Sequence, residues 1–273
     1  MTEFSVSMCV YGRDNPDWFR TAVDSILNQT VPPSEVVVVV DGPVPEELDA
    51  VIRGYEMMPV FKVIRLAENR GHGEARRTGL EHCSNDIVAL MDADDISLPY
   101  RFEKQLAVFA ENPDLSVLSG KIAEFVDEET NVVGYRSVPE RHDEIYAYLK
   151  RRCPFNQMAV MFRKEDVREV GGYLDWYCNE DYYLWIRLRM AGKKFANLSD
   201  VLVNVRVGRD MYMRRGGWKY FRSEARLQRY MLKSRVIGLP TYLMNVSKRL
   251  AVQVLMPSRL RGWVFQKFAR ENK

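Results

Sequence analysis

The chain has 273 residues, 47% of them hydrophobic and 28% charged, and 40 Lys and Arg against 37 Asp and Glu leave a formal net charge of +3. This composition excludes an intrinsically disordered chain, and no apolar run approaches the roughly 20 residues that cross a bilayer. The N-terminus lacks the regions of a secretory signal, so we expect a soluble, cytoplasmic protein. Its four cysteines form no CxxC pair, which argues against a zinc site or a disulfide framework.

The charge is divided unevenly along the chain. Residues 201–273 hold 17 Lys and Arg against 3 Asp and Glu, a net +14, whereas residues 1–200 hold 23 against 34, a net −11. An acidic body followed by a basic tail suggests two roles. We therefore expect one main domain over residues 1–217 and a basic, helical extension over residues 218–273.

Apolar strands and amphipathic helices alternate through the first hundred residues. The pattern predicts strands at 6–10, 35–40, 61–66 and 86–91 and helices at 17–29, 45–57 and 73–82. This βαβαβαβ order predicts an α/β fold with a mostly parallel central sheet flanked by helices. Such sheets bind ligands beyond the carboxyl ends of their strands. Further on, helices are expected at 99–110, 143–152 and 182–191, and strands at 116–125, 132–136 and 158–163.

Three carboxylates follow directly after the fourth predicted strand: Asp92, Asp94 and Asp95. They repel one another unless a cation is present, and Mg²⁺ or Mn²⁺ prefers oxygen ligands and can bridge carboxylates to a diphosphate. The alternative is a polar turn that caps the helix at 99–110, although a cap requires only one carboxylate.

Two other strands leave the sheet at the same edge. There Asp41 could accept hydrogen bonds from a base or a ribose hydroxyl, and Tyr11 could stack on a base, with an ordinary turn as the alternative. The segment 69–77 contains Asn69 and Arg76 but lacks the third glycine of a dinucleotide fingerprint, which disfavours a dehydrogenase. Arg76 near a helix start suits a phosphate, and a plain surface helix is the alternative.

A further acidic pair, Glu180 and Asp181, precedes the helix at 182–191 among aromatic residues. One acid can cap the helix while the other, with its pKa raised by apolar neighbours, serves as a general base; capping alone is the alternative. The arginines between 206 and 217, with Arg214 and Arg215 among them, suit an anion-binding loop, with a solvated turn as the alternative.

In this order, the segments 10–12, 38–42, 69–76, 92–95 and 180–185 resemble the family 2 inverting glycosyltransferases of GT-A fold, over about residues 4–217. The resemblance implies a nucleotide-diphospho-sugar donor across the strand ends, with a UDP-sugar favoured, and Mn²⁺ or Mg²⁺ as cofactor. The acceptor would be a saccharide or a lipid-linked saccharide. A non-catalytic sugar-nucleotide or glycan-binding protein and a nucleotidyltransferase are the alternative functions.

The resemblance also implies roles for single residues. Asp41 would contact the uracil or ribose, Asp92 the ribose or sugar side, and Asp94, with Asp92, the metal. Asp181, beside Glu180, would be the base that deprotonates the acceptor hydroxyl, and an inverting transfer needs no second carboxylate as nucleophile. The remaining donor-binding residues would be Tyr11, Asn69, Arg76, Arg214 and Arg215.

Two features depart from the family pattern. Arg77 stands where family members often have Asn, and no histidine follows His142 to serve as a further metal ligand.

The basic tail interleaves Lys and Arg with aromatic residues, as in amphipathic helices that lie on anionic membranes. We therefore expect a peripheral enzyme on the inner face of the cell membrane, in surface polysaccharide or lipopolysaccharide synthesis. Helices packed on the body with solvated basic faces are the alternative, and no nucleic-acid-binding module is present.

Overall fold

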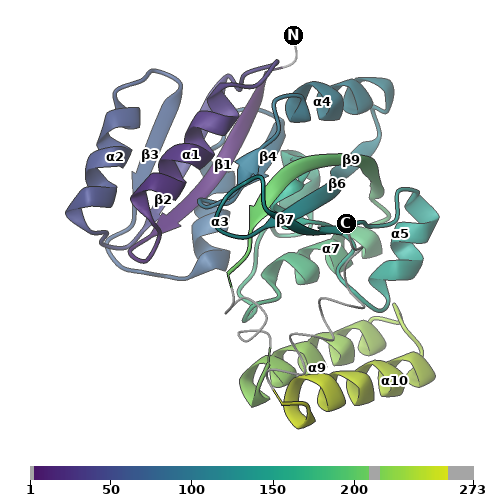
Figure 1. The fold of residues 1–273 in the computed structure, drawn as a ribbon. Helices are drawn as coiled ribbons and strands as arrows, with labels where there is room; N and C mark the ends of the chain where they lie inside the picture. Colours follow the sequence, from purple (N-terminus) through teal and green to yellow (C-terminus); the bar gives the residue numbers. More distant parts are fainter. Residues whose placement is uncertain (1–2, 209–215, 258–273) are drawn as a thin grey trace.

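Within the residues that the computed structural model describes, 3–208 and 216–257, nine strands form one mixed sheet. Their order is β3-β2-β1-β4-β8-β6-β9-β5, and β7 pairs with the outer part of β6 (Figure 1). Helices cover both faces of this sheet. The expected α/β class is therefore confirmed.

The first half of the sheet is parallel and follows the predicted alternation. Its strands are β1 (Phe4–Tyr11), β2 (Glu35–Asp41), β3 (Phe61–Arg65) and β4 (Ile87–Met91). The helices between them are α1 (Pro16–Leu27), α2 (Glu46–Glu56) and α3 (His72–His82). Because β1 lies between β2 and β4, the residues that end these three strands meet at one edge of the sheet, and Tyr11 is opposite Asp41 in register.

The second half of the sheet is mixed. Its strands are β5 (Ile96–Ser97), β6 (Leu115–Phe125), β7 (Val132–Arg136), β8 (Met161–Arg163) and β9 (Lys194–Arg206). Its helices are α4 (Arg101–Glu111), α5 (His142–Leu149), α6 (Lys164–Glu169) and α7 (Glu180–Met190). The predicted strand at 158–163 is shorter than expected, because the 3₁₀ turn η1 (Gln157–Ala159) occupies its beginning.

β9 is a long strand that the sequence pattern did not predict. It pairs in parallel with β6 and, near its end, antiparallel with β5. The segment carries Asn197, Ser199 and Asp200 among its apolar residues, so no regular alternation marks it. Its conformation depends on β6, whose backbone supplies hydrogen-bond partners over most of its length.

β2 shows how the core is divided between the two faces. Val36, Val38 and Val40 pack in the apolar cluster under α1, α2 and α4, whereas Val37 and Val39 pack in the cluster under α3 and α7. All five valines are buried, as expected for a central strand with both faces covered.

Local signals position the first helix and α3. Asn15 Oδ1 accepts hydrogen bonds from the amides of Asp17 (2.9 Å) and Trp18 (3.1 Å), and Pro16 begins α1, so an Asn-Pro pair marks the start of this helix. On α3, a Cβ at Gly79 would lie 2.4 Å from Ser7 Oγ on β1. The glycine therefore allows α3 to pack directly against the sheet.

The described part of the basic extension is a helical hairpin. α9 (Trp218–Lys233) and α10 (Leu239–Leu250) lie side by side below the body, and α10 continues into the short π-helical turn η2 (Ala251–Leu255) (Figure 1). One face of α9, with Leu227 and Met231, is buried in the same apolar cluster as Trp185 of α7. Among the described residues, no helix is long and apolar enough to cross a membrane. The boundary at residue 217 stays a prediction.

Candidate functional site

Tyr11 and Asp41 form one side of the candidate site, at the ends of β1 and β2. Tyr11 is 39% exposed, whereas Asp41 is only 5% exposed. The two oxygens of Asp41 accept the amides of Arg70 (2.7 Å) and Gly71 (3.0 Å), and Asn69 Nδ2 donates to the carbonyl of Asp41 (3.1 Å). Asp41 thus holds the loop that leads into α3, and each oxygen keeps a second lone pair for another donor.

The acidic run after β4 is partly buried. Asp95 is 2% exposed and accepts the backbone amide of Arg206 at 2.9 Å. Burial, and next the charges of Asp94 and Asp92, raise the pKa of Asp95 well above its usual range. α4 begins after Tyr100 without a side-chain cap, so the alternative in which this run caps the helix at 99–110 is wrong.

Two arginines that the sequence did not assign to this run lie against it. Arg206 donates to the carbonyls of Asp94 (3.3 Å) and Asp127 (2.8 Å). Arg101 is fully buried and donates to the carbonyl of Leu90 at 2.7 Å. Arg206 is the last residue of β9 and supports the acidic run directly, which differs from its expected place in an anion-binding loop. Arg214 and Arg215 lie outside the described residues.

Asp14 is a further acid of the site that the sequence did not predict. It follows β1 and accepts the amide of Tyr11 at 2.9 Å. Burial raises the pKa of Asp14 to about 6. The hydrogen bond from Tyr11 opposes this rise, and the charges of Asp94 and Asp92 add to it. The only sequence signal was its position three residues after Tyr11, in the turn that leaves β1.

Arg76 is the centre of the site's charge network. It is buried, and its Nη2 lies 2.9 Å from Asp92 Oδ1, while its Nε donates to His72 Nε2 at 3.1 Å. Although burial opposes the charge, the neighbouring Asp92 raises the pKa of Arg76. Because an arginine only donates, His72 accepts through Nε2 and carries its proton on Nδ1 when neutral.

Glu180 and Asp181 begin α7 on the other side of this network. His72 Nδ1 lies 3.3 Å from Glu180 Oε1. Although burial opposes the shift, the hydrogen bond from His72 and the charge of Arg76 lower the pKa of Glu180. Glu180 is therefore an ionised partner of His72 at neutral pH.

Asp181 differs from its neighbour. Burial, and next the charge of Glu180, raise the pKa of Asp181 to about 6. Its Oδ1 accepts the amide of Tyr182 at 2.6 Å and its Oδ2 lies 3.9 Å from the Cys153 thiol. This bond to the next amide partly fulfils the expected capping, since the side chain of Asn179, the N-cap residue, makes no capping bond. A carboxylate with this pKa suits a general base near neutral pH.

The structure thus brings most of the predicted residues to one edge of the sheet. Arg76 contacts Asp92 directly, and it is linked to Glu180 through His72. Arg77 points elsewhere and pairs with Glu74 on the surface. Among the described residues, no group of three or more His, Cys, Asp or Glu is arranged to hold a metal ion, so the metal and the role of each residue stay predictions.

Comparison with known proteins identifies close relatives over nearly the whole chain. Residues 5–171 match the family model "Glycosyl transferase family 2". An uncharacterized glycosyltransferase of Haemophilus influenzae is 39% identical over 269 residues, which cover 98% of this chain and 100% of that protein. A UDP-Gal:alpha-D-GlcNAc-diphosphoundecaprenol beta-1,3-galactosyltransferase of Escherichia coli is 36% identical, with 98% and 97% covered. The amylovoran biosynthesis glycosyltransferase AmsE of Erwinia amylovora is 35% identical, with 97% and 98% covered.

Solved structures share the fold at low sequence identity. S. aureus TarS 1–349 in complex with UDP-GlcNAc matches with a TM-score of 0.69 and 16% identity, covering 97% of this chain and 79% of that chain. The mannosyltransferase PcManGT from Pyrobaculum calidifontis, in complex with GDP-Man and Mn²⁺, matches with a TM-score of 0.62 and 18% identity, covering 96% and 73%. These likenesses confirm the expected GT-A fold.

Proposed function

The chain belongs to glycosyl transferase family 2 and is a glycosyltransferase, and we propose that it transfers a sugar, with inversion, from a nucleotide-diphospho-sugar to a hydroxyl of a lipid-linked saccharide. The product would be part of a surface polysaccharide or lipopolysaccharide. The names of the relatives from Escherichia coli and Erwinia amylovora support this placement.

The observation that carries the proposal is the pair of contacts made by Arg76. On one side its guanidinium binds Asp92 at the strand ends, where sheets of this kind bind ligands. On the other side it binds His72, which contacts Glu180, next to Asp181. The residues proposed for the donor and for the acceptor are therefore held together by one buried positive charge.

Asp181 is the proposed base for the transfer. Its carboxylate takes the proton of the acceptor hydroxyl, and the hydroxyl oxygen attacks the anomeric carbon from the face opposite the leaving group. The bond between that carbon and the diphosphate oxygen breaks, and the nucleoside diphosphate leaves with the electron pair. Arg76 lies where a positive charge can stabilise the negative charge that develops on the leaving group.

We propose that the acidic run binds a divalent ion, Mn²⁺ or Mg²⁺. Such ions are commonly bound through one or two carboxylates together with substrate phosphates. Asp94 and Asp92 would hold the ion, while Asp95 is engaged with the amide of Arg206. When bound, the ion would neutralise charge on the diphosphate. The pKa of Asp14 is raised mainly by burial, and the further contribution from the charges of Asp94 and Asp92 supports a local excess of negative charge.

A UDP-sugar is the proposed donor. Asp41 and Tyr11 lie at neighbouring strand ends, where a nucleoside can meet both a carboxylate and an aromatic ring. The relative from Escherichia coli is named for UDP-Gal as donor and a diphosphoundecaprenol-linked sugar as acceptor. An acceptor of that class brings the enzyme to a membrane surface.

The outer face of α10 is the proposed contact with that surface. Leu239 and Leu243, one turn apart, are 56% and 55% exposed, and Leu255 in η2 is 72% exposed. Two exposed lysines are close to these leucines in the sequence: Lys233 on α9 and Lys248 on α10. Exposed apolar side chains flanked by cations suit an anionic lipid surface. Peripheral attachment to the inner face of the cell membrane is therefore part of the proposal.

A screen of nucleotide sugars tests the proposed function. The purified chain is incubated with a panel of UDP- and GDP-sugars, Mn²⁺ and a short-chain alkyl N-acetylglucosaminyl diphosphate as acceptor probe. We expect release of the nucleoside diphosphate together with a glycosylated probe of inverted anomeric configuration, and loss of both with a chelator. Release of pyrophosphate would indicate a nucleotidyltransferase instead, and tight donor binding without turnover would indicate a binding protein.

A further inference from the structure

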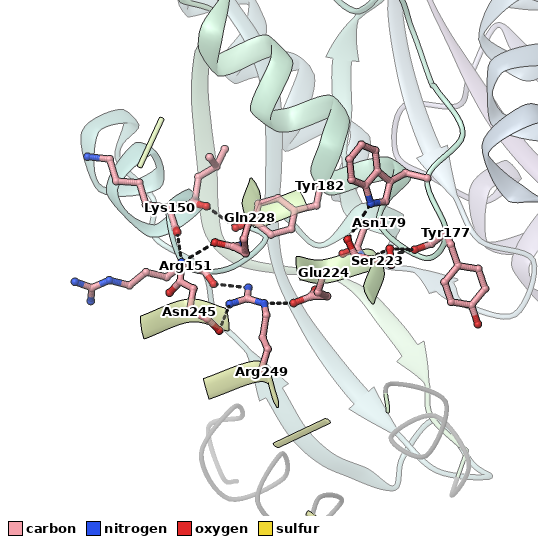
Figure 2. A network of polar contacts seen from close by, with 12 residues as sticks. Lys150, Arg151, Tyr177, Asn179, Tyr182, Ser223, Glu224, Gln228, Asn245 and Arg249 are labelled. Carbon is pink, nitrogen blue, oxygen red and sulfur yellow. Dashed lines mark hydrogen bonds and ion pairs between the residues drawn. The ribbon is translucent and has the colours of Figure 1, made fainter. Parts of the chain in front are cut away.

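A buried serine of α9 holds the turn that leads into α7. Ser223 Oγ donates to the carbonyl of Tyr177 at 2.5 Å and accepts from Asn179 Nδ2 at 3.2 Å (Figure 2). The carbonyl of Ser223 accepts from Trp176 Nε1 at 3.3 Å. Ser223 is 8% exposed. One residue of the hairpin thus contacts three of the four residues directly before Glu180.

One residue of this turn has an unfavourable backbone conformation. Cys178 has a φ of 56°, in the left-handed region, which a non-glycine residue adopts at a cost of roughly 1 kcal/mol. Asn179 is the N-cap residue of α7, a position where asparagine usually accepts a helix amide, yet its side chain makes no capping bond. Its side-chain amide instead donates to Ser223 Oγ of α9 at 3.2 Å and to the carbonyl of Tyr177 at 3.4 Å. Because the backbone bond from the amide of Asn179 to the carbonyl of Trp176 (3.1 Å) closes this turn, the contacts from α9 add to it from outside.

Cationic side chains of α9 also cover the aromatic rings of this turn. Lys219 Nζ lies 4.1 Å from the centre of the Tyr177 ring, and the guanidinium of Arg226 lies 4.5 Å from the centre of the Trp176 ring. Lys219 and Arg226 stand before and after Ser223 on α9, so the same face of the helix covers the turn. Between these two contacts lies the buried hydroxyl of Ser223.

The hairpin has a second attachment, which does not involve the turn. Asn245 Nδ2 donates to the carbonyl of Lys150 at 2.9 Å and to Gln228 Oε1 at 2.8 Å, and Arg249 donates to the carbonyl of Arg151 at 2.9 Å (Figure 2). These carbonyls lie just after the last residue of α5, where they lack partners within the helix. The two attachments can therefore be broken separately.

We propose that Ser223 is a positioning residue for the transfer reaction: through Tyr177 and Asn179 it places the start of α7, and with it Asp181. The proposal rests on the proposed function. A displacement of about 1 Å at a reacting group can reduce a rate by about 100-fold. Ser223 also belongs to the hairpin whose outer face is the proposed lipid contact, so it connects that face to the proposed base.

Two matched substitutions separate positioning from simple stability. Ser223→Ala removes two hydrogen bonds at the turn. Asn245→Ala also removes two, one to the carbonyl of Lys150 after α5 and one to Gln228 within the hairpin. Both variants should unfold at a lower temperature than the wild type. Ser223→Ala should lower kcat at least tenfold, with the donor KM and the Kd for UDP changed less than twofold, whereas Asn245→Ala should keep kcat within twofold. Ser223→Thr, which retains the hydroxyl, should restore most of the kcat.

A measurement without substrate completes the test. The amide of Tyr183 is bonded to the carbonyl of Asn179 at 2.9 Å, and its hydrogen exchange should become at least tenfold faster in Ser223→Ala but not in Asn245→Ala. Equal losses of kcat in both variants, or unchanged exchange at Tyr183 in Ser223→Ala, would overturn the positioning role. If the wild type turns over no nucleotide sugar, the proposed function fails, and the exchange result alone decides whether Ser223 holds the turn.

Discussion

Arg76 on α3 and Asp92 at the end of β4 form an ion pair of 2.9 Å, with 6% and 28% of their side chains exposed. Because α3 and β4 are distant in the sequence from α7, this pair and the adjoining His72 contact are tertiary links between the two parts of the site. A charge pair shielded to this extent is costly to break, since the remaining partner keeps its charge without compensation.

Arg76→Met should therefore reduce both activity and stability. Loss of the charge that is proposed to face the donor should lower kcat/KM by at least about 100-fold. The free energy of unfolding should fall by about 2 kcal/mol or more because Asp92 loses its partner. Steady-state kinetics and urea unfolding measure the two effects. Arg77→Met is the matched control: Arg77 pairs with Glu74 on the surface, and its loss should cost less than about 0.5 kcal/mol. Equal effects of the two substitutions would contradict the assignment.

Asp181→Asn should abolish most of the transfer. Removal of a positioned base lowers kcat by about 10²- to 10⁴-fold. In the wild type, the pKa of about 6 predicts that kcat/KM falls as the pH decreases through about 6, because the protonated carboxyl cannot take the acceptor proton. Measurement of kcat/KM between pH 4.5 and 8.5 shows the pH at which the rate falls. Asp143→Asn, on the exposed start of α5, should leave both the rate and the profile unchanged; a wild-type rate that is flat down to pH 4.5 would exclude Asp181 as the base.

The same substitution should make the protein more stable at neutral pH. The pKa of Asp181 is higher in the folded chain, at about 6, than its ordinary value of 3.8, so the folded state binds more protons between these values. Wild-type stability relative to Asp181→Asn therefore decreases as the pH rises from about 4 to 6. We expect the variant to be more stable by about 1–3 kcal/mol at pH 7.5 and equally stable near pH 4. Urea unfolding at the two pH values measures the difference, and a gain independent of pH would show that ionisation of Asp181 is not its cause.

Gly79 and Gly54 give a test of how closely α3 packs on the sheet. A Cβ at Gly79 would lie 2.4 Å from Ser7 Oγ, so Gly79→Ala should lower the free energy of unfolding by about 1–3 kcal/mol. A Cβ at Gly54, within α2, would meet nothing within 4 Å. Gly54→Ala should instead raise the stability by up to about 1 kcal/mol, because alanine favours the helix. Thermal unfolding of the two variants beside the wild type should show a lower melting temperature for Gly79→Ala and a higher one for Gly54→Ala.

The proposed lipid contact is tested by vesicle sedimentation. Full-length protein should bind vesicles of phosphatidylglycerol and phosphatidylcholine at low salt, and bind less in 0.5 M NaCl (roughly a 4 Å screening length) because the charges are screened. The double variant Leu239→Gln/Leu243→Gln should bind at least about tenfold more weakly, since two leucines each contribute about 1.5 kcal/mol or more when buried. Met57→Gln, at an 85% exposed methionine after α2, is the control and should bind as the wild type does. Binding that is unaffected by the double variant would remove α10 as the contact.

The fold was predictable where the sequence carries strong local signals. The uninterrupted valines of β2 and the Asn15-Pro16 start of α1 predict those elements without reference to the rest of the chain. β9 was not predictable in this way, because its polar residues obscure the alternation and its partner β6 is far away in the sequence. The two-residue β5 has too few residues to form a pattern.

The site was predictable in position more than in contacts. Parallel strand ends bring Tyr11, Asp41 and Asp92 to one edge, which follows from the order of the elements. The contact between His72 and Glu180 depends on how α3 packs against α7, and no local pattern records it. Arg101 and Asp14 were missed for a similar reason: a charged residue in a helix or a turn is usually solvated, and only the packed chain shows that Arg101 is buried and Asp14 half-buried.

Arg101 has a further consequence for the reaction cycle. Burial lowers the pKa of its guanidinium to about 9, which still leaves it charged at neutral pH, and its hydrogen bonds go to neutral acceptors such as the carbonyl of Leu90 and the amide oxygen of Gln105. Its charge is therefore available at longer range to the acidic run after β4. This fixed internal counter-charge acts on Asp92 and Asp95 and offsets part of the repulsion among the carboxylates, so that a closely spaced acidic run can be kept at the end of β4.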